Sequence, residues 1–141
     1  MLIVTLDGPA GSGKSTAARR LASRLRVLFL DTGAMYRGLT AVCLDHGIIP
    51  AETPAQVLEV ARQVRLGYDW SLDPPGMLVD GRDVTARLRD PDTTCHVSDI
   101  AGMPEVRQVL VAVQQRIGRE HGRFVSEGRD QGSVVFPEAT G

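Results

Sequence analysis

The sequence predicts an α/β fold, in which helices flank a parallel β-sheet and a small antiparallel β-sheet is inserted into that frame. Short, continuous apolar runs alternate with longer segments of helical periodicity, a pattern typical of buried parallel strands joined by helices. Between residues 66 and 85 the pattern changes to short alternating segments separated by turn residues, which indicates antiparallel hairpins. A chain of 141 residues is expected to form one domain with a substantial core.

The N-terminal part of the chain predicts a strand, a helix, a second strand and a second helix. Residues 2–6 and 27–30 are the two apolar runs that are expected to form buried parallel strands. Residues 14–26 place small and apolar side chains on one helical face, and residues 33–46 continue as a helix that ends near Gly47.

Two further helices are predicted from their start signals and their periodicity. Thr53 and Gln56 have the spacing of a capping box, and Pro54 fits the first helical position, so a helix should run from there to about Arg65. Residues 104–119 carry apolar side chains at helical spacing and predict another buried helix face.

The inserted segment is expected to span about residues 66–100 and to form part of the region that binds the second substrate. Turns are predicted at residues 73–76 and 80–81. The tripeptide Gly-Arg-Asp at residues 81–83 follows the Asp-Gly turn signal and is interpreted as part of a hairpin, without a functional role. After the helix at 104–119, residues 123–126 predict a third parallel strand.

Composition argues against several classes of partner. The net charge is −1 and the isoelectric point is about 6.3, so neither nucleic acid nor an anionic membrane is an expected partner. Cys43 and Cys95 are too few and too far apart for a disulfide framework or a zinc site, which fits a reducing cytoplasm. No secretory signal or membrane-spanning run is recognised in the sequence, and we expect a cytoplasmic monomer.

The segment Gly8-Pro-Ala-Gly-Ser-Gly-Lys-Ser-Thr16 matches G-x-x-x-x-G-K-[ST] and lies between the first strand and the first helix. Its glycines let successive N–H groups point into one concavity at the N-terminus of a helix, where polyphosphate binds. Lys14 is the only lysine of the chain and would reach the outer phosphates, while the Ser15 hydroxyl would ligate the Mg²⁺ that accompanies a nucleoside triphosphate. A glycine-rich turn without a ligand is the alternative. The predicted phosphate-binding residues are Gly8, Ala10, Gly11, Ser12, Gly13, Lys14, Ser15 and Thr16.

Two other segments follow the ends of predicted strands. In residues 31–37, Thr32 and Tyr36 would lie one helical turn apart, with Arg37 beside them facing the phosphate-binding loop. These side chains could hold the phosphate of a second substrate, although an ordinary capped helix explains the stretch equally well. Residues 127–130, Glu-Gly-Arg-Asp, leave the third strand at its carboxyl end, the edge at which open α/β sheets bind ligands.

With these motifs, the chain resembles the bacterial cytidylate kinases, which transfer the γ-phosphoryl group of ATP to CMP or dCMP. The resemblance covers residues 2–141 and rests on segments 7–16, 31–37, 78–85 and 128–137. The first two signatures also occur in adenylate kinases, whereas the Gly-Arg-Asp segment that ends in Val-Val-Phe-Pro is far more specific. The resemblance implies a P-loop kinase fold, with Mg²⁺ and ATP as cofactor and donor.

The resemblance also implies roles for individual residues. Arg37 and Arg129 would hold the acceptor phosphate, Asp130 would help to read cytosine, and Glu127 would stand near Mg²⁺ through water. Cytosine offers an amino donor beside ring acceptors, so a carboxylate together with a cationic or hydroxyl donor suits it. Arg107 has a plainer explanation as a surface arginine balanced by an acidic neighbour. The residues expected to bind CMP are Thr32, Tyr36, Arg37, Ser98, Arg107, Arg129 and Asp130, and those expected to act in catalysis are Lys14, Arg129 and Asp130.

The chain departs from the family pattern at its C-terminal end. Members of the family continue with a mobile lid that carries further arginines and with a segment that holds adenine, and neither is found in this sequence. We therefore expect a C-terminally incomplete kinase domain. The two alternatives are another small-molecule kinase with the same phosphate-binding loop, and a nucleotide-binding fragment without catalytic activity.

Overall fold

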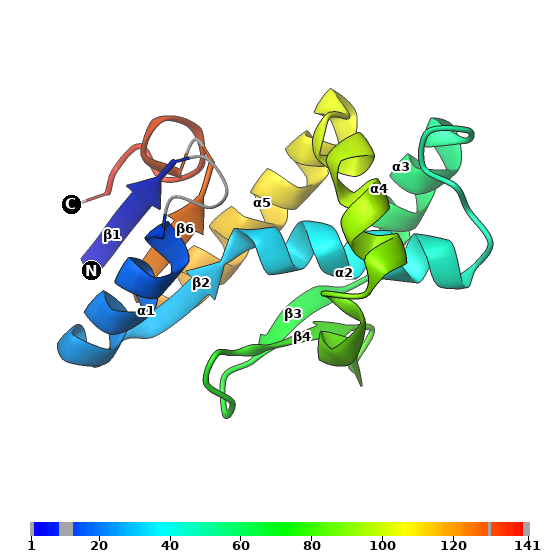
Figure 1. The fold of residues 1–141 in the computed structure, drawn as a ribbon. Helices are drawn as coiled ribbons and strands as arrows, with labels where there is room; N and C mark the ends of the chain where they lie inside the picture. The colour runs from blue at the N-terminus through cyan, green and yellow to red at the C-terminus, as the bar shows by residue number, and fades with distance from the viewer. Residues whose placement is uncertain (1, 9–12, 130, 140–141) are drawn as a thin grey trace.

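The computed structural model describes residues 2–8, 13–129 and 131–139, and at Lys14 and Ser133 it describes the backbone alone. Figure 1 shows the main sheet at one side of the molecule and the helices α2 to α5 extending from it. None of the helices in the described part of the chain is long and apolar enough to cross a membrane.

The main sheet has three strands in the order β1-β6-β2, and both pairs are parallel. These strands are β1 (Leu2–Asp7), β2 (Leu28–Asp31) and β6 (Arg123–Gly128). The strand nearest the C-terminus therefore lies between the two N-terminal strands, so the three carboxyl ends meet at one edge of the sheet. The α/β fold with a parallel sheet is confirmed, and each predicted strand lies within a residue or two of its expected position.

Five α-helices surround the two sheets in the described part of the chain. They are α1 (Lys14–Leu25), α2 (Thr32–Asp45), α3 (Pro54–Gln63), α4 (Pro91–Ala101) and α5 (Pro104–His121). A short 3₁₀ turn, η1 (Thr85–Arg87), leads into α4, and a π-type turn, η2 (Gln131–Val135), follows β6.

Side chains on the parallel strands alternate between two cores. Phe29 and Val125 pack with Ala18 and Ala22 of α1 on one face of the sheet. Ile3, Leu30 and Phe124 belong to the larger core on the other face, which includes residues of α2 and α5. This alternation follows from the two-residue period of a strand, and it explains why the predicted strands read as continuous apolar runs.

The inserted antiparallel sheet is also confirmed. It contains β3 (Leu66–Asp69), β4 (Gly76–Val79) and β5 (Arg82–Asp83) in that order. Asp80 and Gly81, at the turn between β4 and β5, have φ angles of 52° and 80°, as a tight two-residue hairpin turn requires. The Gly-Arg-Asp copy at 81–83 therefore lies in a hairpin turn, as expected.

Two predictions about helices differ from the structure. The side-chain hydroxyl of Thr53 makes no capping bond and instead donates to the Ile49 carbonyl at 3.4 Å, so the capping box is wrong although Pro54 does open α3. Helix α4 had no counterpart among the predicted elements, and it packs along α2. Its backbone nevertheless begins at a proline, a residue that favours the first turn of a helix.

Candidate active site

The predicted phosphate-binding segment lies between β1, which ends at Asp7, and α1, which begins at Lys14 (Figure 1). Gly13 directly precedes the helix with φ of 79°, a left-handed conformation that glycine adopts without strain. Gly8, Ser15 and Thr16 are described, whereas Ala10, Gly11, Ser12 and the side chain of Lys14 lie outside the described part of the structure. The strand, loop and helix therefore occur in the order that the motif requires.

Ser15 and Glu127 come together at the centre of the sheet edge. The Ser15 hydroxyl donates to Glu127 Oε1 at 2.9 Å, although 112 residues separate the two in the sequence. Glu127 is 4% exposed, and it is paired with Asp31 in the register of β6 with β2. A hydroxyl and two carboxylates thus lie beside the start of α1.

The negative charge of Glu127 acts on the neighbouring carboxyl group of Asp31. Burial raises the pKa of Asp31 from 3.8 to about 6, and the negative charge of Glu127 contributes to the rise. The phenol of Tyr68, which donates to the Asp31 carbonyl at 2.6 Å, also has a raised pKa, first because of burial and then because of these two charges. Negative charge therefore accumulates at this end of the site, which favours a bound cation.

The donor set suits Mg²⁺. Hydroxyl and carboxylate oxygens are the ligands that this ion prefers, usually with several waters and substrate phosphates completing its shell. Ser15, Glu127 and Asp31 supply such oxygens at the loop where phosphates would bind. No group of three or more His, Cys, Asp or Glu side chains placed to hold a metal ion occurs among the described residues.

Helix α2 begins immediately after Asp31 and carries two of the predicted substrate residues, Thr32 and Tyr36. The Thr32 hydroxyl is 3% exposed and donates to the Glu127 carbonyl at 2.8 Å, so it joins α2 to β6. Gly128 permits this close approach, because a Cβ there would lie 2.0 Å from Thr32 Oγ1. Tyr36 is half-buried one turn further along the helix.

Arg37 faces a different neighbour from the one expected. Its Nη1 donates to the Leu88 carbonyl and to Thr94 Oγ1, each at 3.0 Å, which places it against η1 and α4 as well as near the site. The pKa of Arg37 is lowered, first by burial and then by the nearby positive charge of Arg89. The positive charge of Arg89 also opposes the rise in the pKa of Asp31. Two guanidinium groups therefore act on this corner of the site.

The segment that follows β6 is held by a network of polar side chains. Asp7 accepts hydrogen bonds from the backbone N–H groups of Gln131, at 2.5 Å, and Gly132, at 3.1 Å. The Gln131 side chain accepts from Ser126 Oγ and donates to the Arg129 carbonyl at 3.2 Å. Arg129 is exposed at the sheet edge, and Asp130 lies outside the described residues.

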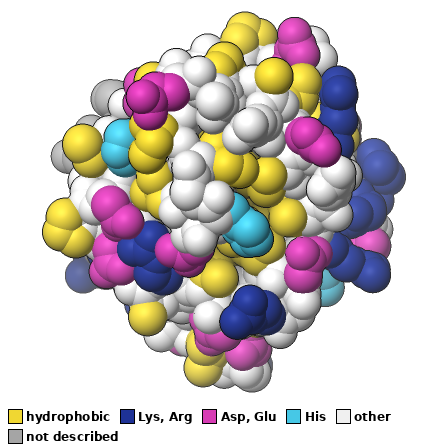
Figure 2. All heavy atoms as spheres, turned by 90° about the vertical axis from the view of Figure 1, so that its right-hand side faces the viewer, with side chains coloured by type: hydrophobic (Ala, Val, Ile, Leu, Met, Phe, Trp, Pro, Cys, Tyr) yellow, Lys and Arg dark blue, Asp and Glu magenta, His cyan; other side chains and the backbone are white. Residues whose placement is uncertain are grey.

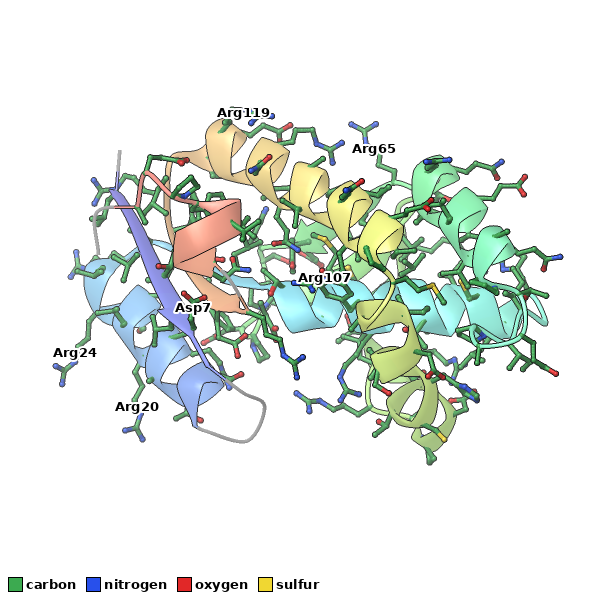
Figure 3. All side chains as sticks on the ribbon, turned by 90° about the horizontal axis from the view of Figure 1, so that it is seen from above. Asp7, Arg20, Arg24, Arg65, Arg107 and Arg119 are labelled. Atoms are coloured by element: carbon green, nitrogen blue, oxygen red, sulfur yellow. The ribbon has the colours of Figure 1, made fainter. Side chains whose placement is uncertain are left out.

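The two remaining predicted base-reading residues come from neighbouring helices. Ser98 is exposed on α4, and Arg107 is half-buried in the first turn of α5. Figure 3 shows Arg107 pointing from α5 toward the middle of the molecule, whereas Arg20 and Arg24 of α1 point away from it. The substrate contacts of all the predicted site residues stay predictions.

Sequence reasoning had assigned no role to Asp31, Arg89, Asp7 or Gln131. Asp31 carried the same signal as Glu127, a carboxylate at the end of a predicted parallel strand, and could have been found in this way. Asp7 and Gln131 meet across the fold, and Arg89 acts through its charge on Arg37 and Asp31. The sequence offers no local pattern for either effect.

Comparison with known proteins shows which family the chain belongs to. A family profile described as cytidylate kinase matches residues 4–140. The chain is 41% identical over 138 residues to a cytidylate kinase of Cutibacterium acnes and 45% identical over 142 residues to one of Rhodococcus opacus, and each alignment covers 98% of this chain. It is also 45% identical over 140 residues, 97% of this chain, to a bifunctional pantoate ligase/cytidylate kinase of Synechococcus sp..

The chain spans 62% of the length of the Cutibacterium protein, 60% of the Rhodococcus protein and 26% of the bifunctional Synechococcus protein. The match extends over nearly the whole chain and includes both the phosphate-binding loop and the segment after β6. The chain belongs to the cytidylate kinase family.

Proposed function

We propose that this protein transfers the γ-phosphoryl group of MgATP to CMP or dCMP and releases ADP with CDP or dCDP. The observation that carries the proposal is the hydrogen bond of 2.9 Å between Ser15 and Glu127. It joins the loop that would hold the donor phosphates to the strand that leads into Arg129 and Asp130. The segments proposed to hold the donor and the acceptor thus reach one edge of the sheet, and transfer between two bound nucleotides requires such proximity.

On the donor side, the N–H groups of the loop and of the first turn of α1 would bind the phosphates of ATP. Lys14 would contact the outer phosphates. Ser15, Glu127 and Asp31 would hold Mg²⁺, Glu127 through water. When bound, the ion would neutralise the negative charge on the β- and γ-phosphates.

On the acceptor side, Arg37 and Arg129 would bind the phosphate of CMP, and Arg89 is a third candidate because its charge acts on Arg37 and Asp31. Ser98, Arg107 and Asp130 would read the base. These residues orient the acceptor oxygen toward the donor phosphate, and positioning of this kind accounts for most of the catalysis of phosphoryl transfer. No covalent enzyme intermediate is needed.

The surroundings that suit this activity are cytoplasmic. Cys43 and Cys95 are both free thiols, which is typical of a reducing compartment. The net charge of −1 favours small nucleotides recognised by local arginines over broad binding to nucleic acid.

The test is an assay of ADP release, carried out on this chain and on any longer natural form of it, with CMP, dCMP, UMP, AMP and shikimate as separate acceptors. We expect turnover with CMP and dCMP, little with UMP, and none with AMP or shikimate. Lys14→Ala serves as the control, because it removes the charge that the donor phosphates need. Turnover with shikimate alone would make the protein a different kinase, and binding of ATP without turnover on any acceptor would make it a non-catalytic nucleotide-binding protein.

Asp130 provides a sharper test of base selection. Its carboxylate would accept from the cytosine amino group, whereas uracil presents a carbonyl oxygen at that position. We expect Asp130→Asn to lower kcat/KM for CMP and to narrow the preference over UMP by about ten- to a hundredfold. Ratios of kcat/KM for the two acceptors measure this effect. An unchanged ratio would remove Asp130 from the base-reading set.

A further inference from the structure

Arg87 lies at the centre of an ion-pair network that links α2 to the start of α4. Its Nη1 contacts Asp90 Oδ2 at 2.6 Å and Asp92 Oδ1 at 2.8 Å. Its Nη2 contacts Asp92 Oδ2 at 3.0 Å and Asp45 Oδ1 at 2.9 Å. Asp45 is the last residue of α2, whereas Asp90 and Asp92 flank the first residue of α4. On the side of the molecule where these elements lie, acidic and basic side chains gather close together (Figure 2).

The geometry of this network is stronger than that of an ordinary surface ion pair. The two terminal nitrogens of the guanidinium, Nη1 and Nη2, both contact Asp92, and bidentate contacts of this kind are stronger and more directional than single ones. Hydrogen bonds from Arg87 lower the pKa of Asp92 to about 2. The Arg87 side chain is only 27% exposed. The side chains of Asp45, Asp90 and Asp92 are 43–54% exposed. Isolated surface pairs contribute little to stability, but pairs with bidentate geometry and networks of several charges are exceptions.

The segment held by Arg87 also holds Arg37. Leu88 follows Arg87 directly and Thr94 lies in the first turn of α4, and these two residues accept the hydrogen bonds from Arg37 Nη1 at 3.0 Å. Helix α2 is therefore joined to the segment 87–94 at two places, by Arg37 near its beginning and by Asp45 at its end.

These contacts leave part of the Arg37 guanidinium available. Among the described residues, its Nε and Nη2 donate no hydrogen bond. One nitrogen is thus anchored to the protein while the other two can address an anion, and a guanidinium fixed in this way loses less conformational freedom when it binds a phosphate.

We propose that Arg87 is a positioning residue for the acceptor site. It fixes the segment 87–94 against the C-terminus of α2, and this segment in turn fixes the guanidinium of Arg37. The inference rests on the proposed function, because it assumes that Arg37 binds the phosphate of CMP.

The first test compares steady-state kinetics of the protein with those of Arg87→Ala, Arg87→Lys and Asp45→Asn. We expect Arg87→Ala to raise KM for CMP about tenfold, while KM for ATP and kcat change less than about twofold. Arg87→Lys should restore part of the loss, since it keeps the charge but cannot make the bidentate contact. Asp45→Asn removes a single contact and should show a smaller effect of the same kind.

The matched control is Arg116→Ala. Arg116 is an exposed arginine that pairs with Glu120 at 3.8 Å on α5, away from the network, and its removal should leave KM for CMP unchanged. If Arg116→Ala and Arg87→Ala raise KM for CMP equally, the effect is one of general charge and the proposal is wrong.

The deciding test is a double-mutant cycle between Arg87 and Arg37. If Arg87 acts through Arg37, then Arg87→Ala should add less than about twofold to KM for CMP in a protein that already carries Arg37→Ala. A full tenfold addition would overturn the proposal, because it would show that Arg87 acts independently of Arg37. An unchanged KM in Arg87→Ala, in a protein that phosphorylates CMP, would overturn this inference alone. Absence of CMP phosphorylation by the unsubstituted protein would overturn the proposed function and this inference with it.

Discussion

At the scale of single residues, the most informative contact is the pairing of Asp31 with Glu127. Two adjacent carboxylates repel each other when both are ionised, and the raised pKa of Asp31 reflects this repulsion together with burial. The sequence predicted that each of these residues directly follows a parallel strand. It could not predict that they are neighbours, because that depends on β6 lying next to β2, an arrangement formed between distant parts of the chain.

Asp31→Asn tests the cost of this pairing. The pKa of Asp31 is raised in the folded protein to about 6, so the carboxyl group lowers stability as pH rises from about 4 through 6. Asparagine lacks this charge but can still accept the hydrogen bond from Ala34 N–H at the start of α2. We therefore expect Asp31→Asn to be more stable than the unsubstituted protein by about 1–3 kcal/mol at pH 8.

Below pH 4 the two proteins should have equal stability, because the carboxyl group is then protonated in both the folded and the unfolded state. Urea denaturation at pH 3.5, 5, 6.5 and 8 measures the trend. Addition of Mg²⁺ at pH 8 should stabilise the unsubstituted protein more than the variant. A stability difference that is independent of pH would show that ionisation of Asp31 does not lower the free energy of unfolding, which would contradict the raised pKa.

At the scale of secondary structure, the spacing of apolar residues predicted a helix correctly where one face of the helix is apolar. Helix α5 buries Val106, Leu110 and Ile117 on the predicted face. Helix α4 is different, because it buries only Thr93 and Ile100 and contains several β-branched residues of low helix propensity. Its packing along α2 and the ion pairs at its start supply what the local sequence does not.

Gly118 tests the packing of α5 against the end of the sheet. A Cβ at this position would lie 2.6 Å from Phe136 Cε1 and 2.9 Å from Phe124 Cζ, two rings that pack edge to face with centroids 4.9 Å apart. Alanine normally favours a helix over glycine by about 1 kcal/mol, but we expect Gly118→Ala to destabilise the protein by about 1–3 kcal/mol because both rings must move.

Thermal and urea denaturation of Gly118→Ala measure this loss. Gly67→Ala is the control, since a Cβ at that position meets nothing within 4 Å, and its effect should stay within about 0.5 kcal/mol. Equal stability of Gly118→Ala and the unsubstituted protein would mean that the contact between α5 and η2 is looser than the structure indicates.

At the scale of the whole molecule, the small antiparallel sheet is joined to the active site. Met77 and Val79 of β4 share the large core with Met35 and Leu39 of α2, and the Tyr68 hydroxyl reaches the Asp31 carbonyl at 2.6 Å. The existence of this sheet could be predicted from turn signals. Its docking could not, because the residues that meet are more than 30 positions apart and carry no pattern specific to each other.

Tyr68→Phe tests whether the two sheets unfold together. The change removes a buried hydroxyl that bonds to Asp31, and leaving the carbonyl without this partner should cost about 1–3 kcal/mol. Trp70 is the only tryptophan and stacks on Tyr68 with centroids 4.9 Å apart, so its fluorescence reports on the small sheet, while far-UV circular dichroism reports on the helices. In urea, we expect the midpoints of both signals to shift together to lower urea concentration, because one cooperative unit contains both sheets.

The control is Thr40→Val, which removes a hydroxyl bonded to Tyr36 within α2 and should lower the urea midpoint less. A fluorescence transition that separates from the dichroism transition would show that the inserted sheet unfolds independently, and its contact with Asp31 would then be too weak to fix the site.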